Sequence, residues 1–285
     1  MRRTSSIPEL RDWIASEKKL GRKIALVPTM GYLHKGHLTL IEHAKQTNTF
    51  VVASIFVNPL QFGPNEDLSR YPRDLERDVR LIRDAGVDAL FHPTVEEMYP
   101  RPMVTYVEVG ELDKVLCGAT RPGHFRGVTT VVSKLFHIVE PDMAFFGQKD
   151  YQQYLIIKRM VSDLNFPIEI CPVPIVREED GLAMSSRNVL LKTLDRQEAV
   201  ILSQSLNEAE EQLRAGQRSA REIERQIRAR IHQESHGLID YVEVRAAGDL
   251  SEVTEIKGPV LIALAVKFGT TRLIDNKVVE VETIV

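Results

Sequence analysis

The chain has 285 residues, of which 43% are hydrophobic, and its formal net charge is −3 at pH 7. This size allows a substantial core and two domains. The charge excludes an overall basic field that attracts nucleic acid or an anionic membrane. No apolar run approaches the length of a membrane span. We therefore expect small-molecule ligands.

The cysteines and the N-terminus indicate the compartment. Cys117 and Cys171 lie far apart and outside any CxxC pattern, which is typical of free thiols in a reducing environment. The first residues contain no apolar core of a signal peptide. We therefore predict a cytoplasmic protein.

The N-terminal part begins with a predicted helix over residues 5–20. An apolar strand over 24–27, an amphipathic helix over 37–47 and an apolar run over 50–57 then form one βαβ unit. Such a crossover is right-handed and gives parallel strands, and the uniform hydrophobicity of its second strand predicts cover on both faces.

Residues 28–37 form the turn between this strand and this helix. The first amides of a helix have no intrahelical partner, and together with the helix dipole they bind phosphate oxygens. His34 and His37 can both face such a ligand and stabilise charge on a polyphosphate under attack. An isolated HxGH could also be a surface histidine and a cap, whereas zinc lacks a third ligand at suitable spacing. The flanking strand and helix favour phosphate.

A polar loop follows the second strand at Asn58 and Pro59. Ligands bind beyond the carboxyl ends of strands in open α/β sheets, so Asn58 and Gln61 are candidate substrate contacts. The alternatives are an Asx turn and a solvated loop side chain. Further on we predict a helix over 74–85 and a strand over 87–91.

Residues 104–139 show a weaker secondary-structure pattern than the segments before them. Residues 104–109 alternate like a strand, and a helix is predicted over 128–139. Between them, the loop 121–127 carries two arginines and a histidine. It either reaches an anion or is simply solvated.

A second strand-glycine-helix corner follows a predicted strand over 142–146. Lys149 at its tip suits a phosphate, Asp150 suits either a helix cap or a ribose hydroxyl, and Gln153 faces the same opening one turn later. Each of these side chains alternatively has only a capping or surface role.

Strand 168–176 ends the alternation of strands and helices, and its prolines indicate a sheet edge. The hydroxyls of Ser185 and Ser186 and the fork of Arg187 suit phosphate, or else form an N-cap cluster. Helices over 195–214 and from 219 onward precede three strands, over 239–244, 260–266 and 273–281. We therefore predict an α/β protein with a Rossmann-like parallel-sheet domain over 1–175 and a smaller α+β domain over 176–285.

Five segments in chain order resemble the pantothenate synthetase (pantoate–β-alanine ligase) family of the HxGH nucleotidyltransferase superfamily. They are PTMGYLHKGHLTL (28–40), FVNPLQFGPNEDLSRYPRD (56–74), RPGHFRGV (121–128), FGQKDYQQ (146–153) and MSSRN (184–188). Tyr32, Lys35, Leu60 and Gln148 depart from residues common in the family, and none of them removes a group that the chemistry needs.

The resemblance implies an ATP-dependent ligase. Pantoate would attack the α-phosphorus of ATP to give pantoyl adenylate and pyrophosphate, and the amine of β-alanine would then displace AMP. Mg²⁺ would accompany ATP, held largely by phosphate oxygens and water. The family is typically homodimeric.

The resemblance also assigns site residues. His34, His37 and Lys149 would be the catalytic groups, Gln61 and Gln153 would bind pantoate, and Gln61 would also position β-alanine. The 176–285 domain would act as a lid. The residues expected to bind ATP are Met30, Gly31, Tyr32, Leu33, His34, Lys35, Gly36, His37, Gly147, Gln148, Lys149, Asp150, Val176, Met184, Ser185, Ser186 and Arg187.

Three other functions use similar features. A nucleotidylyltransferase would leave the nucleotidyl group on its product, and a non-catalytic nucleotide-binding protein would bind ATP without turnover. A class I aminoacyl-tRNA synthetase would use residues 184–187 as a degenerate signature loop, but the short acidic chain lacks a basic RNA-binding extension.

Overall fold

The structure is a computed structural model that describes residues 1–64 and 66–281. The chain divides into two compact units. We call residues Met1–Gly110, Arg121–Gln148 and Ile156–Ile175 the parallel-sheet unit, and residues Glu111–Thr120, Lys149–Leu155 and Val176–Val285 the antiparallel-sheet unit. Each unit is described by itself.

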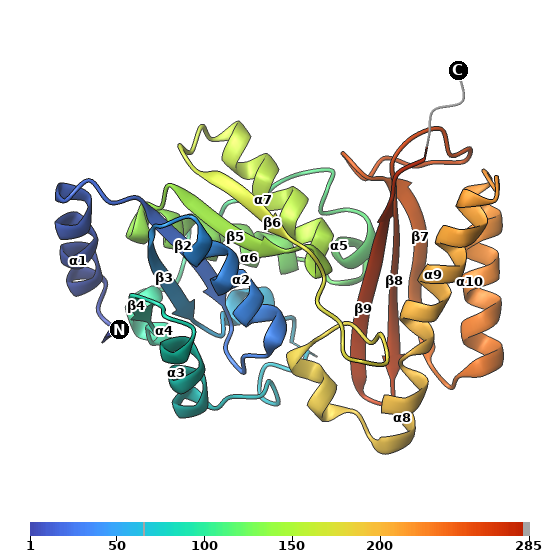
Figure 1. The fold of residues 1–285 in the computed structure, drawn as a ribbon, viewed down its shortest axis with the longest axis horizontal. Helices are drawn as coiled ribbons and strands as arrows, with labels where there is room; N and C mark the ends of the chain where they lie inside the picture. The colour runs from blue at the N-terminus through green and yellow to red at the C-terminus, as the bar shows by residue number, and fades with distance from the viewer. Residues whose placement is uncertain (65, 282–285) are drawn as a thin grey trace. The chain divides into compact units, whose positions relative to one another are not determined.

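A six-stranded parallel sheet organises the first unit (Figure 1). Its strands, in spatial order, are β1 (Arg2–Thr4), β4 (Ala89–Phe91), β3 (Phe50–Ile55), β2 (Ile24–Thr29), β5 (Met143–Gly147) and β6 (Glu169–Val173). The central strands β2 and β3 are buried along nearly their whole length, as predicted from their uniform hydrophobicity.

Helices cover this sheet. Because side chains alternate between the two faces along each strand, each helix packs against every second residue of a strand. On one face, the apolar stripes of α2 (Lys35–Gln46) and α3 (Leu75–Asp84) pack against alternate residues of β2 and β3. Helices α1 (Ile7–Lys19) and α6 (His124–Val139) contact each other, and α6 also contacts β2. Shorter segments are η1 (Pro59–Gln61) and α4 (Val95–Met98).

The strand order creates a switch point in the chain path. From β2 the chain moves outward through β3 to β4, and it returns to the other side of β2 to form β5 and then β6. Parallel pairing joins β2 to both β3 and β5, so the carboxyl ends of these strands share one edge of the sheet. In open α/β sheets, ligands bind at this position.

An antiparallel sheet in the order β7 (Leu238–Ala246), β8 (Val260–Phe268) and β9 (Thr271–Val279) organises the second unit. Helices α9 (Ile201–Arg214) and α10 (Ala220–Glu234) close a continuous apolar core with this sheet. Shorter segments are α5 (Leu116–Thr120), η3 (Ser186–Leu190) and α8 (Thr193–Glu198). Between β5 and β6 in sequence, the chain forms η2 (Gln148–Asp150) and α7 (Tyr151–Asp163).

These sheets confirm the predicted fold class, but one predicted strand is wrong. Residues 104–109 form no strand: Val104 is 90% exposed, and the backbone of Val107 bonds to hydroxyls of α6. Thr130 Oγ1 accepts from Val107 N, and Thr129 Oγ1 donates to Val107 O. The alternation here therefore belongs to a segment whose Val107 backbone bonds to side chains of a helix.

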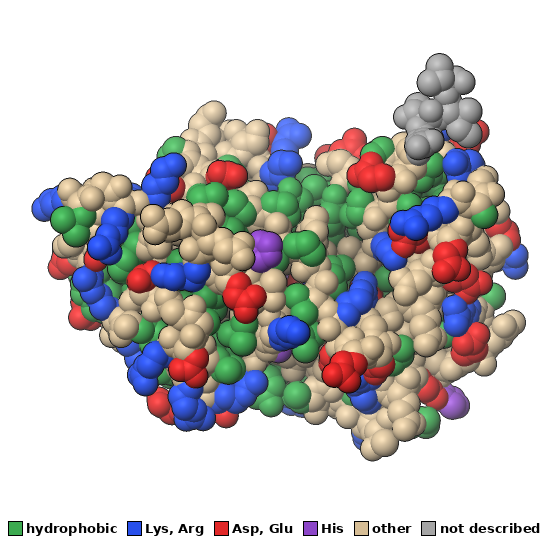
Figure 2. Space-filling model, in the orientation of Figure 1, with side chains coloured by type: hydrophobic (Ala, Val, Ile, Leu, Met, Phe, Trp, Pro, Cys, Tyr) green, Lys and Arg blue, Asp and Glu red, His purple; other side chains and the backbone are tan. Residues whose placement is uncertain are grey.

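Other differences are smaller. The predicted helix 195–214 is broken into α8 and α9, and the edge strand β1 has no counterpart among the predicted elements. On the face shown in Figure 2, positive and negative side chains are interspersed, in agreement with the small net charge. No helix among the described residues is both long enough and apolar enough to cross a membrane.

Candidate active site

The turn after β2 is shaped by a positive φ angle and a close contact. Gly31 has φ +81°, and a Cβ atom there would lie 3.0 Å from Ile55 Cγ2 and 3.1 Å from Asp78 Oδ2. Glycine is therefore required both for the backbone conformation and for space. The turn leads directly into α2, as the predicted strand-to-helix corner requires.

Asp78, on α3, holds this turn from outside the motif. Its carboxylate accepts hydrogen bonds from Tyr32 N at 2.6 Å and from Leu33 N at 2.8 Å. The side chain is only 1% exposed, and burial raises the pKa of its carboxyl although the two amide bonds act in the opposite direction. Arg77 contacts the same carboxylate at 3.4 Å and lies over the Tyr32 ring at 5.2 Å.

The two histidines meet at the start of α2. His34 is the N-cap residue, and its ring centroid lies 4.0 Å from that of His37. The backbone nitrogen of His34 donates to His37 Nδ1 at 3.3 Å, so Nδ1 carries no proton and the neutral ring carries its proton on Nε2. No acidic residue lies in the first turn. The helix therefore presents hydrogen-bond donors and a positive dipole end, which suit an anion.

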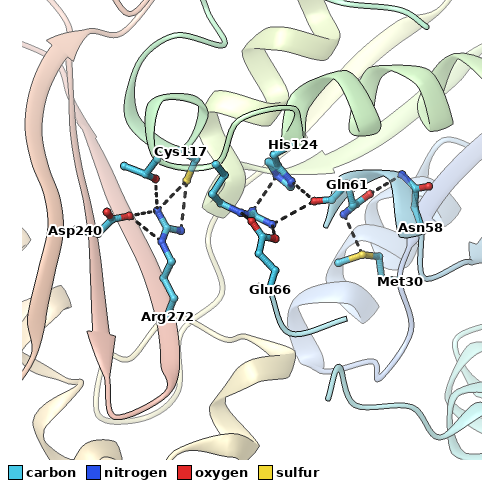
Figure 3. Close-up of polar contacts among 10 residues, drawn as sticks. Met30, Asn58, Gln61, Glu66, Cys117, His124, Asp240 and Arg272 are labelled. Carbon is cyan, nitrogen blue, oxygen red and sulfur yellow. Dashed lines mark hydrogen bonds and ion pairs between the residues drawn. The ribbon is translucent and has the colours of Figure 1, made fainter. Parts of the chain in front are cut away.

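Gln61 is buried at the end of η1, and both ends of its amide contact the protein (Figure 3). Asn58 Nδ2 donates to Gln61 Oε1 at 3.1 Å and to Gly127 O at 3.1 Å. Gln61 Nε2 lies 3.0 Å from Met30 Sδ. The structure thus brings Gln61 to Met30, the first residue of the predicted ATP-binding turn.

Asn58 itself is 1% exposed, and its polar atoms are used by the protein. Its Oδ1 accepts from Tyr99 Oη at 2.8 Å and from Leu60 N at 3.3 Å, which is the Asx-type cap that the sequence allowed as an alternative. Burial raises the pKa of the Tyr99 hydroxyl, which keeps it protonated and able to donate.

The loop 121–127, which the sequence left between an anion contact and a solvated loop, contacts the protein. Arg121 forms an ion pair with Glu66, and its Nη1 lies 3.0 Å from His124 Nε2. His124 Nδ1 in turn lies 2.8 Å from the carbonyl oxygen of Gln61. Sequence reasoning missed the roles of Glu66, Asp78 and His124, because each depends on a partner far along the chain.

The second corner begins where β5 ends at Gly147 and continues through η2. In the antiparallel-sheet unit, the carbonyl oxygen of Lys149 accepts a hydrogen bond from Asn276 Nδ2, on β9, at 2.8 Å. Asp150 is exposed, and Gln153 lies partly buried in the first turn of α7.

A short hairpin-like segment presents the Met184–Arg187 loop. Met184 N donates to Val176 O at 3.0 Å, and Arg177 pairs with Ala183. Arg177 forms two hydrogen bonds, at 2.7 and 3.0 Å, with the buried carboxylate of Asp275. The base of this segment is therefore anchored to β9.

Within the loop, the Ser185 hydroxyl accepts from Arg187 N at 3.2 Å and caps η3. Ser186 is buried, whereas Met184 and Arg187 are partly exposed. The predicted cap is thus present at Ser185.

The candidate residues fall in both units. The parallel-sheet unit contains Met30, Gly31, Tyr32, Leu33, His34, Lys35, Gly36, His37, Gln61, Gly147 and Gln148. The antiparallel-sheet unit contains Lys149, Asp150, Gln153, Val176, Met184, Ser185, Ser186 and Arg187. Among the described residues, no group of three or more His, Cys, Asp or Glu side chains is suited to hold a metal ion.

Comparison with known proteins decides the family. A family model described as pantoate-beta-alanine ligase matches residues 2–278. Over 274 residues the chain is 65% identical to a pantothenate synthetase of Desulfitobacterium hafniense. This match covers 96% of this chain and 97% of the relative. The chain belongs to the pantothenate synthetase family.

Other members agree over the full length. A pantothenate synthetase of Acetivibrio thermocellus is 60% identical over 281 residues, which cover 99% of this chain and 100% of that one. The crystal structure of pantothenate synthetase from Thermus thermophilus has a TM-score of 0.92 and 48% identity, over 97% of this chain and 99% of that one.

The crystal structure of pantoate-beta-alanine ligase from Francisella tularensis, complexed with beta-gamma ATP and beta-alanine, has a TM-score of 0.80 and 33% identity. The match covers 97% of each chain. As a pantothenate synthetase, the protein condenses pantoate with β-alanine and uses ATP to do so.

Proposed function

We propose that this pantothenate synthetase works in two steps. The pantoate carboxylate attacks the α-phosphorus of ATP and releases pyrophosphate, and the β-alanine amine then attacks the acyl carbon of pantoyl adenylate and releases AMP. The observation that carries this proposal is the start of α2, where the His34 and His37 rings lie 4.0 Å apart beside the first amides of the helix. Gln61 is held directly beside the same turn through Met30.

The first step needs positive charge on the polyphosphate more than it needs a covalent nucleophile. His34 and His37 supply donors to the phosphates, and the proton on His37 Nε2 is the one that can follow the leaving pyrophosphate. Lys149 adds a point charge. The remaining contacts to ATP come from Met30, Gly31, Tyr32, Leu33, Lys35, Gly36, Gly147, Gln148, Asp150, Val176, Met184, Ser185, Ser186 and Arg187.

Two glutamines recognise pantoate in this proposal. A primary amide offers two donors and one acceptor, which matches a hydroxy acid. Gln61 Oε1 is engaged by Asn58, and one hydrogen of Nε2 points to Met30, so the second hydrogen of Nε2 serves the substrate. Gln153 supplies the second amide, and Gln61 also orients β-alanine.

Mg²⁺ accompanies ATP in this proposal and neutralises charge on the phosphate oxygens. The donors at the start of α2 are imidazoles and amides, and Mg²⁺ instead prefers oxygen ligands. The ion would therefore be held chiefly by the phosphates and water, with no carboxylate cage from the protein.

Three broader assignments follow from the family resemblance. Residues 1–175 bind nucleotide and substrates, and residues 176–285 act as a lid. The enzyme is a homodimer, and it works in the cytoplasm. Light scattering of the purified protein during size-exclusion chromatography tests the dimer, because a mass near 32.3 kDa would contradict it.

One experiment tests the two-step scheme. The protein is incubated with MgATP and pantoate alone, and exchange of labelled pyrophosphate into ATP is measured. We expect exchange without β-alanine, and joint release of AMP and pantothenate once β-alanine is added. A strict requirement of the exchange for β-alanine would contradict a separate adenylate step.

A further inference from the structure

The main chain of Gln61 is held by a residue with no role in the proposal so far. His124, the first residue of α6, places Nδ1 at 2.8 Å from Gln61 O. Arg121 Nη2 approaches the same oxygen at 3.4 Å. The carbonyl therefore meets two side chains from one loop-helix junction, whereas the Gln61 side chain is fixed separately by Asn58 and Met30.

The partners of His124 determine its protonation state. Arg121 Nη1 lies 3.0 Å from His124 Nε2, and a guanidinium can only donate. Nε2 must then accept, which places the ring proton on Nδ1. From there it is donated to Gln61 O. Arg121 thus selects the one neutral tautomer that can hold the Gln61 carbonyl.

Glu66 fixes Arg121 in turn. Arg121 Nε donates to Glu66 Oε1 at 2.8 Å and Nη2 donates to Oε2 at 2.5 Å, and both side chains are largely buried, at 17% and 24% exposed. Burial alone would raise the pKa of Glu66. The hydrogen bonds and charge of Arg121, together with the charge of a protonated His124 and a backbone hydrogen bond from Gly63, outweigh it, so the pKa lies below 4.5. The carboxylate is therefore ionised at neutral pH and orients the guanidinium from both sides.

The backbone of α6 also approaches η1 closely. A Cβ atom on Gly127 would lie 2.2 Å from Leu60 O, and the Gly127 carbonyl accepts from Asn58, which itself holds the Gln61 amide. One helix thus fixes Gln61 twice, at its main chain through His124 and at its side chain through Asn58.

We propose that His124 is a positioning residue for Gln61 in pantoate binding, and that the Arg121–Glu66 ion pair sets the tautomer with which it acts. This inference rests on the proposed pantoate role of Gln61. His124 acts only through Gln61, so its loss weakens pantoate binding and leaves ATP binding unchanged.

A matched pair of substitutions separates this role from simple packing. In His124→Asn, the side-chain amide nitrogen takes the place of Nδ1 and still donates to Gln61 O. In His124→Gln, the polar group lies near Nε2 and the donor to Gln61 is lost. We expect the pantoate KM to stay within about 2-fold in the asparagine variant and to rise about 5- to 10-fold in the glutamine variant, the usual scale for one hydrogen bond. His137→Asn, at the exposed end of α6, is the control.

A double-mutant cycle with Gln61→Ala tests whether the effect passes through Gln61. We expect His124→Gln to raise the pantoate KM in the native background and to leave it unchanged in the Gln61→Ala background, with the ATP KM constant throughout. Equal pantoate KM values for His124→Asn and His124→Gln would overturn the inference. A rise in the pantoate KM caused by His124→Gln in the Gln61→Ala background would overturn it too.

The same data separate the two levels of the proposal. If Gln61→Ala leaves the pantoate KM unchanged, the role of Gln61 fails and the inference falls with it. If Gln61→Ala raises the pantoate KM but the two His124 variants do not differ, only the positioning role fails. Arg121→Lys provides a second variant if His124→Gln does not fold: it shortens the group that selects the tautomer, and an unchanged pantoate KM there would overturn the inference too.

Discussion

Asp78 accepts a 2.6 Å hydrogen bond from the backbone nitrogen of Tyr32, although the two residues are 46 positions apart in the sequence. The same carboxylate takes the amide of Leu33. These are the residues that lead into the two histidines, so a side chain on another helix sets the shape of the turn that we propose binds the phosphates.

Asp78→Ala should therefore lower both stability and the first chemical step. The substitution leaves two backbone N–H groups without their acceptor, and each such buried group costs about 1–3 kcal/mol. We expect a lower melting temperature and a loss of ATP–pyrophosphate exchange of at least about 10-fold, because the turn is no longer held in one conformation. Asp84→Ala, at the exposed end of α3, is the control. Full exchange activity in a folded Asp78 variant would refute this role.

His37→Ala should impair adenylate formation without unfolding the protein. Loss of one preorganised donor to developing charge typically costs about 10²-fold in rate or more. The measurement is single-turnover formation of the adenylate with saturating ATP and pantoate, compared with His43→Gln in the last turn of the same helix. A rate within about 2-fold of the native one, far from the loss expected for such a donor, would reduce His37 to a capping residue.

Substitutions of the two glutamines and of the lysine should affect the binding of different substrates. Gln61→Ala and Gln153→Ala should weaken pantoate by about 1–3 kcal/mol each, since a buried polar partner loses its hydrogen bond. Lys149→Ala should instead weaken ATP use. The measurement is a pair of titrations for each variant, one of pantoate at saturating ATP and one of ATP at saturating pantoate. Glutamine variants that lose ATP affinity and keep pantoate affinity would contradict the assignment.

The Arg121–Glu66 ion pair should give stability with a defined pH dependence. The folded pKa of Glu66 lies below 4.5, so its contribution is present above pH 4.5 and is lost as the pH falls through the folded pKa. The melting temperatures of the native protein and of Glu66→Gln should thus differ by a constant amount down to about pH 4.5 and converge below it. Exposed Glu108→Gln provides the baseline. A gap that widens in acid would show that the ion pair is not its source.

Much of this architecture could be predicted because its signals are local. Uniformly apolar strands, the glycines of the HxGH turn and the three-residue spacing of His34 and His37 are properties of neighbouring residues, and the structure agrees with them. Asp78 could not be found this way. It lies among charged residues of α3, a pattern that favours a solvated helix face, and only the fold brings it to Tyr32 and Leu33.

The misread segments fail for the same reason. Residues 104–109 carry the alternation of a strand, but hydroxyls of α6 take the hydrogen bonds that a neighbouring strand would take. Arg121 and His124 have the composition of a solvated basic loop, and their function in the fold depends on Glu66 and on the Gln61 carbonyl, 55 and 63 positions away. Sequence periodicity indicates which face of a helix or strand is apolar. It does not indicate which polar group from a distant part of the sequence contacts that element in the fold.

The division of the chain also has a consequence for its biosynthesis. Helix α5 belongs to the antiparallel-sheet unit, where Cys117 Sγ lies 3.3 Å from Tyr241 Oη, 124 positions later, and where α5 packs on β7 and β8. At a translation rate of roughly 5–20 residues per second, α5 leaves the ribosome on the order of ten seconds before β8. Until β7 and β8 emerge, α5 lacks the sheet on which it packs, and its apolar residues Leu116 and Cys117 leave the nascent chain open to aggregation and to chaperones during that interval.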